Sequence, residues 1–352
     1  MLSTVIFIMV LSVLIVVHEF GHFIMAKRCG VKVESFSLGF GPKIIGITKG
    51  DTEYKISAVP LGGYVKLAGE THQDKVTGSE WEFMSKSVWQ RFKIVIFGPV
   101  LNYILGFLLF SIVFMMGAPT LTNEVGGVLD DFPAKAAGIR EGDRIISIDG
   151  EDIEYWNELT EIVHKKKEGE IDLILLRGNK EMNLKVKPKI KEYKDIFGKE
   201  VKIALMGIKP SAELAFIKYG PLESVKKGFT KIVELTALTF KALWNLIIGR
   251  LSLKESVTGP VGIFMLTTQA ARMGLVYLLN IMAVISTSLA IFNVLPIPVL
   301  DGGHILFLFI EKMRGRPLSP KVQEIAIQVG LWLLIILMLS VLYFDIIRLF
   351  KK

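Results

Sequence analysis

The chain has 352 residues, of which 51% are hydrophobic, and its mean hydropathy is +0.48. This composition is too apolar for an ordinary soluble enzyme and indicates an integral membrane protein with soluble insertions. The formal net charge of +8 does not favour a nucleic-acid partner, because the basic residues are scattered along the chain. Attraction of cytoplasmic loops to anionic membrane lipid accounts for much of that charge. The single cysteine, Cys29, excludes an internal disulfide and a cysteine-based zinc site.

The first predicted transmembrane helix covers residues 1–26 and contains the sequence HEFGH from His18 to His22. Residues four apart share one face of a helix, so both imidazoles can reach a single metal ion. The His-Glu-x-x-His pattern is typical of metalloproteases, in which two histidines bind Zn²⁺ and the glutamate is the general base. A chance motif on a buried helix is the alternative, but ionisable residues inside a membrane are costly and rarely idle. We therefore predict His18 and His22 as Zn²⁺ ligands and Glu19 as the catalytic base.

Basic residues set the expected orientation of this helix. Lys27, Arg28 and Lys32 follow the apolar run, and no basic residue precedes it. The positive-inside rule then places the N-terminus outside and the other end of the helix in the cytoplasm. The run lacks the basic start of a signal peptide, so we expect it to be retained as a span. The metal site is expected within the membrane, near the cytoplasmic face.

Residues 27–92 are predicted to form a cytoplasmic-side loop with β structure. Ile44–Ile47 and Tyr54–Val59 flank a Lys-Gly-Asp turn and predict a hairpin, and Leu61–Leu67 predicts a further edge strand. So apolar a segment beside a membrane metal site is expected to re-enter the bilayer, where its backbone must be buried in protein or line a cavity. A small cytoplasmic β-sheet is the alternative.

A second transmembrane helix is predicted at residues 93–117, where Asn102 is a buried amide that needs partners. Residues 123–190 then have the character of a soluble α/β domain. The run GIREGDRIISIDG at Gly138–Gly150 predicts a strand that enters an Asp-Gly turn, and the apolar spacing after Trp156 predicts an amphipathic helix. This segment resembles a PDZ domain, which implies that it holds an extended peptide or a protein terminus by strand addition.

The third predicted transmembrane helix, residues 274–304, ends in the sequence NVLPIPVLDGGH. Pro296 and Pro298 force the chain out of helix, and carbonyls released at membrane depth must face protein or a wet cavity. Asp301 is an obvious third metal ligand in this setting. His304 offers another imidazole, but a role in supporting the ligands is favoured over ligation.

The remaining segments complete the expected topology. Residues 220–273 are expected to form amphipathic helices that lie at the membrane interface, with lysines opposite an apolar face. Residues 305–325 are expected to form a basic cytoplasmic loop, and residues 326–348 are expected to form the fourth transmembrane helix. The expected fold is thus an α-helical polytopic membrane protein with four transmembrane helices, a membrane-associated β-hairpin region and an inserted α/β PDZ domain. Both termini and the PDZ domain are expected outside the cytoplasm, and the basic residues from Arg348 onward are a mild exception to the charge rule.

Four motifs carry a resemblance to a known family: HEFGH at His18–His22, PLGGYVKL at Pro60–Leu67, GPVLN at Gly98–Asn102 and NVLPIPVLDGGH at Asn293–His304. Together they resemble the site-2 protease family of intramembrane zinc metalloproteases, specifically its bacterial RseP-type branch, over nearly the whole chain. The resemblance implies regulated intramembrane proteolysis in the cytoplasmic (inner) membrane. The expected substrates are single-span membrane proteins, such as anti-sigma factors, or remnant signal peptides. Many members of that branch carry two PDZ domains, whereas this chain has room for one.

A substrate helix hides its carbonyl groups and must be unwound before cleavage, so it needs backbone partners. The proline-broken end of the third span and the glycine pair of the predicted edge strand both offer such partners. Asn293 is expected to hydrogen-bond the substrate backbone, in keeping with the substrate clamp that the resemblance implies. Asn102 either does similar work or bridges two spans. The candidate substrate-binding residues are Asn293, Pro296, Pro298, Gly62, Gly63 and Asn102.

Two other functions are alternatives to a protease. A membrane-bound PDZ adaptor with a non-catalytic metal site is the first, but a structural site has no need of a general base such as Glu19. A metal transporter is the second, but the chain lacks paired repeats and a polar route through several spans. The sequence therefore favours an intramembrane zinc metalloprotease.

Overall fold

The computed structural model describes residues 2–70, 77–166, 168–195 and 198–350, and the chain divides into two compact units. The helical unit consists of Met1–Val113, Pro221–Phe240 and Ser252–Lys352. The second unit, called the PDZ unit because it contains the segment expected to be a PDZ domain, consists of Phe114–Gly220 and Lys241–Leu251. Each unit packs around its own cluster of buried hydrophobic side chains.

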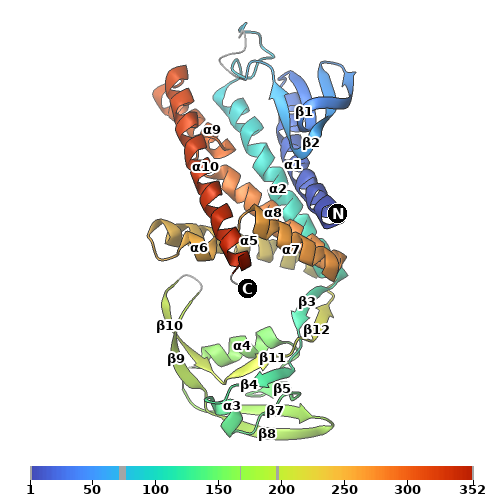
Figure 1. Cartoon of the computed structure of the whole chain (residues 1–352), viewed down its shortest axis with the longest axis vertical. Coiled ribbons are helices and arrows are strands. Elements are labelled where there is room, and N and C mark those ends of the chain that lie inside the picture. The colour runs from blue at the N-terminus through green and yellow to red at the C-terminus, as the bar shows by residue number, and fades with distance from the viewer. Residues whose placement is uncertain (1, 71–76, 167, 196–197, 351–352) are drawn as a thin grey trace. The chain divides into compact units, whose positions relative to one another are not determined.

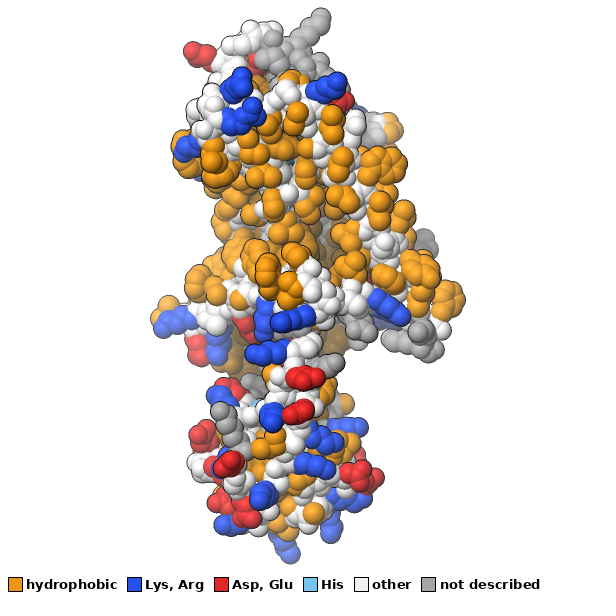
Figure 2. Space-filling model, turned by 90° about the vertical axis from the view of Figure 1, so that its left-hand side faces the viewer, with side chains coloured by type: hydrophobic (Ala, Val, Ile, Leu, Met, Phe, Trp, Pro, Cys, Tyr) orange, Lys and Arg blue, Asp and Glu red, His pale blue; other side chains and the backbone are white. Residues whose placement is uncertain are grey.

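Four helices of the helical unit are long and apolar enough to cross a membrane, which confirms the expected polytopic fold. They are α1 (Leu2–Arg28), α2 (Val88–Met116), α8 (Leu275–Val294) and α10 (Pro320–Phe350). Helices α2 and α10 begin at Val88 and Pro320, before residues 93 and 326, because polar first turns extend both helices beyond the apolar stretch. Figure 2 shows hydrophobic side chains covering the middle of this unit, with Lys and Arg side chains above and below them. An apolar band with basic rims is the surface that a bilayer requires.

Further helices complete this unit, and the last of them takes the end of the third predicted segment. They are α5 (Pro221–Ile247), of which the part up to Phe240 belongs to this unit, α6 (Leu253–Ser256), α7 (Pro260–Met273) and α9 (Asp301–Arg314). Helix α5 exposes large apolar side chains such as Phe229, as an interfacial helix does. Helix α7 packs against α1, α8 and α10. Helix α8 ends at Val294 and α9 begins at Asp301, so Asp301 belongs to a helix of its own.

The loop after α1 forms a long two-stranded hairpin that packs beside α1 (Figure 1). Strand β1 (Val33–Lys49) pairs antiparallel with β2 (Thr52–Leu67). Residues 35–38 of β1 have partners both in residues 53–56 and in residues 63–66 of β2. The two segments expected as separate strands are therefore halves of one strand, and both lie against the start of β1. Residues 71–76 of this loop lie outside the described residues.

The far part of the hairpin is apolar but uncovered. Residues 40–49 of β1 are all exposed, and Ile44 and Ile47 retain 69% and 70% of their surface. Apolar strand residues without protein contacts are costly in water. They are expected in a segment that lies in the bilayer, provided that its backbone groups are paired.

The PDZ unit is a small β fold with one well-formed core. Its first elements are β3 (Ala118–Leu121), β4 (Val125–Val128), α3 (Pro133–Ala136), β5 (Arg144–Ile148), β6 (Glu151–Asp152) and α4 (Trp156–Lys165). Its later strands are β7 (Ile171–Arg177), β8 (Lys180–Val186), β9 (Lys189–Lys194), β10 (Glu200–Leu205), β11 (Ile208–Pro210) and β12 (Leu214–Ile217). The main sheet has the order β6-β5-β7-β8, and three two-stranded pairs join β11 to β4, β10 to β9 and β12 to β3.

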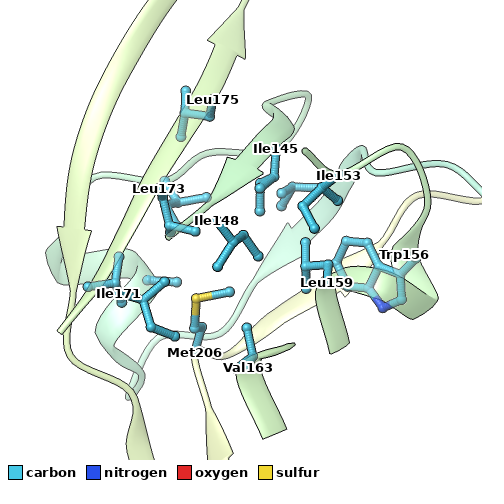
Figure 3. Packing of buried hydrophobic residues seen from close by; sticks show 14 residues of the cluster. Ile145, Ile148, Ile153, Trp156, Leu159, Val163, Ile171, Leu173, Leu175 and Met206 are labelled. Atoms are coloured by element: carbon cyan, nitrogen blue, oxygen red, sulfur yellow. The ribbon is translucent and has the colours of Figure 1, made fainter. Parts of the chain in front are cut away.

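The core of this unit extends beyond the domain end expected at residue 190. Figure 3 shows Met206 among Ile148, Leu159 and Ile171, and only 2% of its surface is exposed. Strand β11 follows at once and pairs with β4. A strand of three residues, such as β11, is too short to show an alternating apolar pattern in the sequence. The domain end expected at residue 190 therefore lies before the end of the core.

Candidate metal centre

His18, His22 and Asp301 converge in the helical unit from two helices that are far apart in sequence. The Nε2 atoms of the two histidines are 3.2 Å apart. The Asp301 Oδ2 atom lies 3.1 Å from Nε2 of His18 and 3.5 Å from Nε2 of His22. Among the described residues this is the group of three that could hold a metal ion. All three side chains are half-buried.

Two glycines allow the histidine helix to approach its neighbour. A Cβ atom on Gly21 of α1 would lie 2.3 Å from the Phe97 carbonyl oxygen of α2. A Cβ atom on Gly98 of α2 would lie 2.3 Å from Nε2 of His22. Neither position has room for a side chain, so the backbones meet here. Nδ1 of His22 lies 2.9 Å from the Ile94 carbonyl oxygen, to which it can donate its proton. That bond leaves Nε2 as the lone-pair nitrogen that faces Asp301.

Asp301 is placed by a tight turn and a second pair of glycines. The two prolines end α8, and the backbone N–H of Leu300 bonds to the Ile297 carbonyl oxygen to close the turn. A Cβ on Gly302 would lie 2.1 Å from the Leu295 carbonyl oxygen, and one on Gly303 would lie 2.4 Å from that of Ile297. The start of α9 therefore packs directly on the turn, and Asp301 is held at its first position.

The three donor atoms suit a zinc ion. Two ligands bound at about 2.0 Å to a tetrahedral Zn²⁺ lie about 3.3 Å apart, close to the separations seen here. Apart from its close approach to the two histidine nitrogens, the buried Oδ2 atom of Asp301 has no hydrogen-bond partner in the part of the chain that the structure describes. A buried carboxylate oxygen without a partner is costly and is satisfied when it binds a cation. Two imidazoles and one carboxylate also leave a fourth position, as catalytic zinc sites do.

Glu19 lies beside this group but outside it. Its Oε2 atom accepts a hydrogen bond of 3.1 Å from the backbone N–H of Val65 in β2. A Cβ on Gly63 would lie 3.7 Å from Cγ of Glu19, in ordinary contact. The edge of β2 that does not pair with β1 therefore runs past the predicted general base. Gly62 is buried and has φ of +126°, and a Cβ there would overlap the Phe40 ring.

Asn102 lies against a ligand and also joins two helices. Its side-chain amide is 3.4 Å from Nδ1 of His18. Its backbone oxygen accepts a hydrogen bond from the Ser286 hydroxyl of α8. The side chain is 1% exposed, and its Oδ1 atom has no partner within the described residues. Both predicted roles remain compatible with this position.

The other predicted residues follow the third span. Asn293 is half-buried on the last turn of α8, Pro296 is exposed and Pro298 is half-buried. His304 stands one turn after Asp301 and lines a cavity instead of joining the three donor atoms. Sequence reasoning missed the Ile94 carbonyl, because a backbone partner leaves no trace in residue type. The small residue inside HEFGH was the available signal for the close approach of Gly21 to α2.

Comparison with known proteins identifies the family of the chain. The model of peptidase family M50 matches residues 6–337. A putative zinc metalloprotease of Agrobacterium fabrum is 35% identical over 97% of this chain and 94% of its own length. The regulator of sigma-W protease RasP of Bacillus subtilis is 31% identical over 99% of both chains. Among solved structures, the PDZ domain of an SdrC-like protein of Listeria monocytogenes is 27% identical over 25% of this chain and 84% of that domain, with a TM-score of 0.20.

Proposed function

Because the chain belongs to peptidase family M50 and is a zinc metalloprotease with membrane-spanning helices, we propose that it cleaves other membrane proteins within the bilayer. The proposed substrates are single-span proteins such as anti-sigma factors, or remnant signal peptides, in regulated intramembrane proteolysis. The observation that carries this proposal is the convergence of His18 and His22, on the membrane-spanning helix α1, with Asp301, which begins α9 shortly after the spanning helix α8 ends. The general base at Glu19 and the strand edge beside it add the two other parts that peptide hydrolysis needs.

We assign His18, His22 and Asp301 as the ligands of Zn²⁺ and Glu19 as the catalytic residue. Zn²⁺, when bound, supplies a Lewis acid that polarises the scissile carbonyl and acidifies the attacking water. Glu19 takes a proton from that water as its oxygen attacks the carbonyl carbon. The same carboxyl then gives the proton to the amide nitrogen as the peptide C–N bond breaks. The Ile94 carbonyl and Asn102 hold the two imidazoles in place.

The edge of β2 is the proposed docking place of the unwound substrate. The N–H of Val65 on this edge is bonded to Glu19, so an extended peptide added to the edge lies beside Glu19 and takes the place of its carboxylate at Val65. Gly63 has no side chain to separate the peptide from Glu19, and Gly62 shapes the strand before it. The Asn293–Pro298 turn is the proposed partner on the other side of the substrate, with the Asn293 amide as a hydrogen-bonding group.

The proposed orientation places both termini and the PDZ unit outside the cytoplasm, in the cytoplasmic (inner) membrane of a bacterium. Lys27 and Arg28 at the end of α1 and Lys312 and Arg314 at the end of α9 support this orientation. The PDZ unit is then proposed to bind a peptide or protein terminus of the external part of a substrate.

Glu19→Gln tests the proposal, because it removes the base but none of the ligands. The purified variant is expected to bind as much zinc as the wild type and to cleave a tagged single-span substrate at least a hundredfold more slowly. Glu223→Gln on α5 is the matched control, since Glu223 is exposed on another element, and it should cleave normally. Cleavage by the Glu19 variant at the wild-type rate would reject the proposed mechanism.

A further inference from the structure

Helix α9 carries Asp301 but buries little of its own surface against protein. The structure describes this helix in full, and after Gly303 its one buried residue is Leu308. Phe309 and Met313 retain 60% and 74% of their surface. A cavity of about 450 Å³ lies along the helix, with Leu308 in its wall. The turn before Asp301 fixes the start of α9, so the direction of its far end depends on other contacts.

An ion pair joins this far end to the start of α2. Arg91 Nη1 lies 3.1 Å from Glu311 Oε2, and Nη2 of the same guanidinium contacts Oε1. The two side chains retain only 8% and 15% of their surface. Within the part of the chain that the structure describes, no other hydrogen bond or ion pair joins α2 to α9. The next residue, Lys312, places Nζ 4.0 Å from the centre of the Trp89 ring.

The first turn of α2 is a firm attachment point for this pair. The N–H of Ser87 bonds to Oε1 of Gln90, and the N–H of Gln90 bonds back to the Ser87 hydroxyl. Such a reciprocal cap holds the first turn of a helix in place. Nε of Arg91 also bonds to the Lys86 carbonyl oxygen, at 3.1 Å. The guanidinium is therefore fixed to the helix end from which it reaches α9.

Both members of the pair lie on the side of their helix that meets the metal centre. At 3.6 residues per turn, Arg91 and Gly98 are separated by only about 20° around α2. Gly98 is the position against which the His22 ring packs. On α9, Asp301 and Glu311 are separated by about 80°, so they share one side of the helix. Each helix thus presents a part of the metal centre and one half of the ion pair in the same direction.

We propose that Arg91 and Glu311 are positioning residues of the metal centre. A two-pronged pair has one preferred orientation, so it fixes the rotation of α9 about its axis as well as the distance to α2. A rotation of about 10° moves a carboxylate about 5 Å from the axis by about 1 Å. That exceeds the tolerance of a metal site, so Asp301 would no longer face His18 and His22 correctly. This role rests on the ligands assigned under the proposed function, and it acts on Asp301 from about 15 Å along the helix.

The zinc affinity of the full chain, measured by competition with a chelator, tests this role without turnover. Arg91→Lys keeps the charge but cannot form the two-pronged contact, and Glu311→Gln keeps the shape but removes the charge. Each variant is expected to bind zinc about 3- to 10-fold more weakly than the wild type, since it acts on a ligand only indirectly. Exchanging the pair, by Arg91→Glu together with Glu311→Arg, should restore the affinity to within about twofold.

Arg348→Lys is the matched control in the same unit. Arg348 pairs with Asp345 and bonds to the Val257 carbonyl oxygen, and within the described residues it contacts no member of the metal centre. This variant should lower the unfolding temperature of the zinc-free protein and leave the zinc affinity of the folded protein unchanged. The comparison separates positioning of a ligand from a general loss of stability.

Unchanged zinc affinity in both Arg91→Lys and Glu311→Gln would overturn the proposed role. If a single variant does not fold, the exchanged pair decides, because wild-type affinity there supports the role and a loss of about tenfold contradicts it. Asp301→Ala distinguishes this failure from failure of the proposed function. If it keeps its zinc, the ligand assignment is wrong. If it loses zinc while both pair variants keep theirs, the ligands stand and only the role of Arg91 and Glu311 is rejected.

Discussion

At Gly98 the absence of a side chain decides where His22 can point. The imidazole occupies the space in which a Cβ atom would stand, and the Ile94 carbonyl one turn earlier fixes its other nitrogen. Gly302 and Gly303 have the same function for Asp301, because they let α9 start against the carbonyls of the preceding turn. The ligands are thus aimed by residues that cannot bind metal themselves.

Gly98→Ala is expected to weaken zinc binding about 10- to 100-fold, because the new methyl group displaces the His22 ring. Competition with a zinc chelator measures the affinity. Gly106→Ala is the matched control on the same helix. Its Cβ would also overlap a side chain, Thr287 Oγ1 at 2.4 Å, but one that is not part of the metal centre. Equal zinc affinity in both variants would contradict the aiming role of Gly98.

Asp301→Ala and His304→Ala separate ligation from proximity within one helix. The first removes the carboxylate that faces both histidines and is expected to abolish stoichiometric zinc binding and activity, because two histidines alone make a poor site. The second changes a cavity wall and should retain its zinc. Metal analysis of the two purified proteins gives the answer. Full zinc occupancy in the Asp301 variant would show that the ligand assignment is wrong.

Helices α7 and α10 are joined by a buried carboxylate. Asp345 of α10 is 3% exposed and accepts hydrogen bonds from the backbone N–H groups of Gly259 and Gly262 at the start of α7. Arg348 pairs with Asp345 and donates to the Val257 carbonyl oxygen. Negative charge at a helix N-terminus is favourable, so Asp345 stabilises the start of α7. Arg348, which is an exception to the positive-inside rule, is held by its contacts with Asp345 and Val257.

Asp345→Ala should destabilise the helical unit by about 3 kcal/mol, because it leaves two backbone donors and Arg348 without their partner. Thermal unfolding of the purified protein in detergent measures the change. Ser340→Ala on the same helix is the control, since within the described residues its hydroxyl bonds only to the Ile336 carbonyl of its own helix. If both variants unfold at the wild-type temperature, the contact between α7 and α10 does not depend on Asp345.

The elements that the sequence predicts well are those with a strong local signal. Apolar length marks the four spans, and a four-residue spacing places His18 and His22 on one face. The hairpin was expected in pieces, because Gly62 and Pro60 interrupt the pattern of what is a single strand β2. The contact of Val65 with Glu19 depends on how the strand packs on α1, which no local pattern encodes.

The whole molecule joins a unit built for a bilayer to one with a core of ordinary soluble type. The PDZ unit buries its own apolar cluster around Ile145 and Leu173, and its first and last strands pair with each other. Ala118 of β3 stands opposite Ile217 of β12. The chain therefore enters and leaves the PDZ fold at neighbouring points, as an inserted domain does. A boundary at residue 190 would have left Met206 and β11 without their core.

Replacing residues 118–217 by a short Gly/Ser linker should leave the zinc site intact, because none of its residues lies in that range. If the PDZ unit selects substrates by their external part, the shortened enzyme should also cleave substrates that keep a bulky external domain. The comparison uses one span with and without a folded external domain, cut by both enzymes. An enzyme that still rejects the bulky form as strongly as the intact chain would refute this selection. A folded, zinc-loaded but inactive one would assign the unit to substrate positioning instead.

The position of the cut tests the central claim most directly. Wild-type enzyme is incubated with a single-span substrate that carries a folded tag on each side, and the new termini are identified by mass spectrometry. We predict that both new termini fall inside the apolar segment of the substrate, and that neither appears with Glu19→Gln. New termini confined to the polar flanks, or the same fragments from the Glu19 variant, would contradict an intramembrane protease that works through this metal centre.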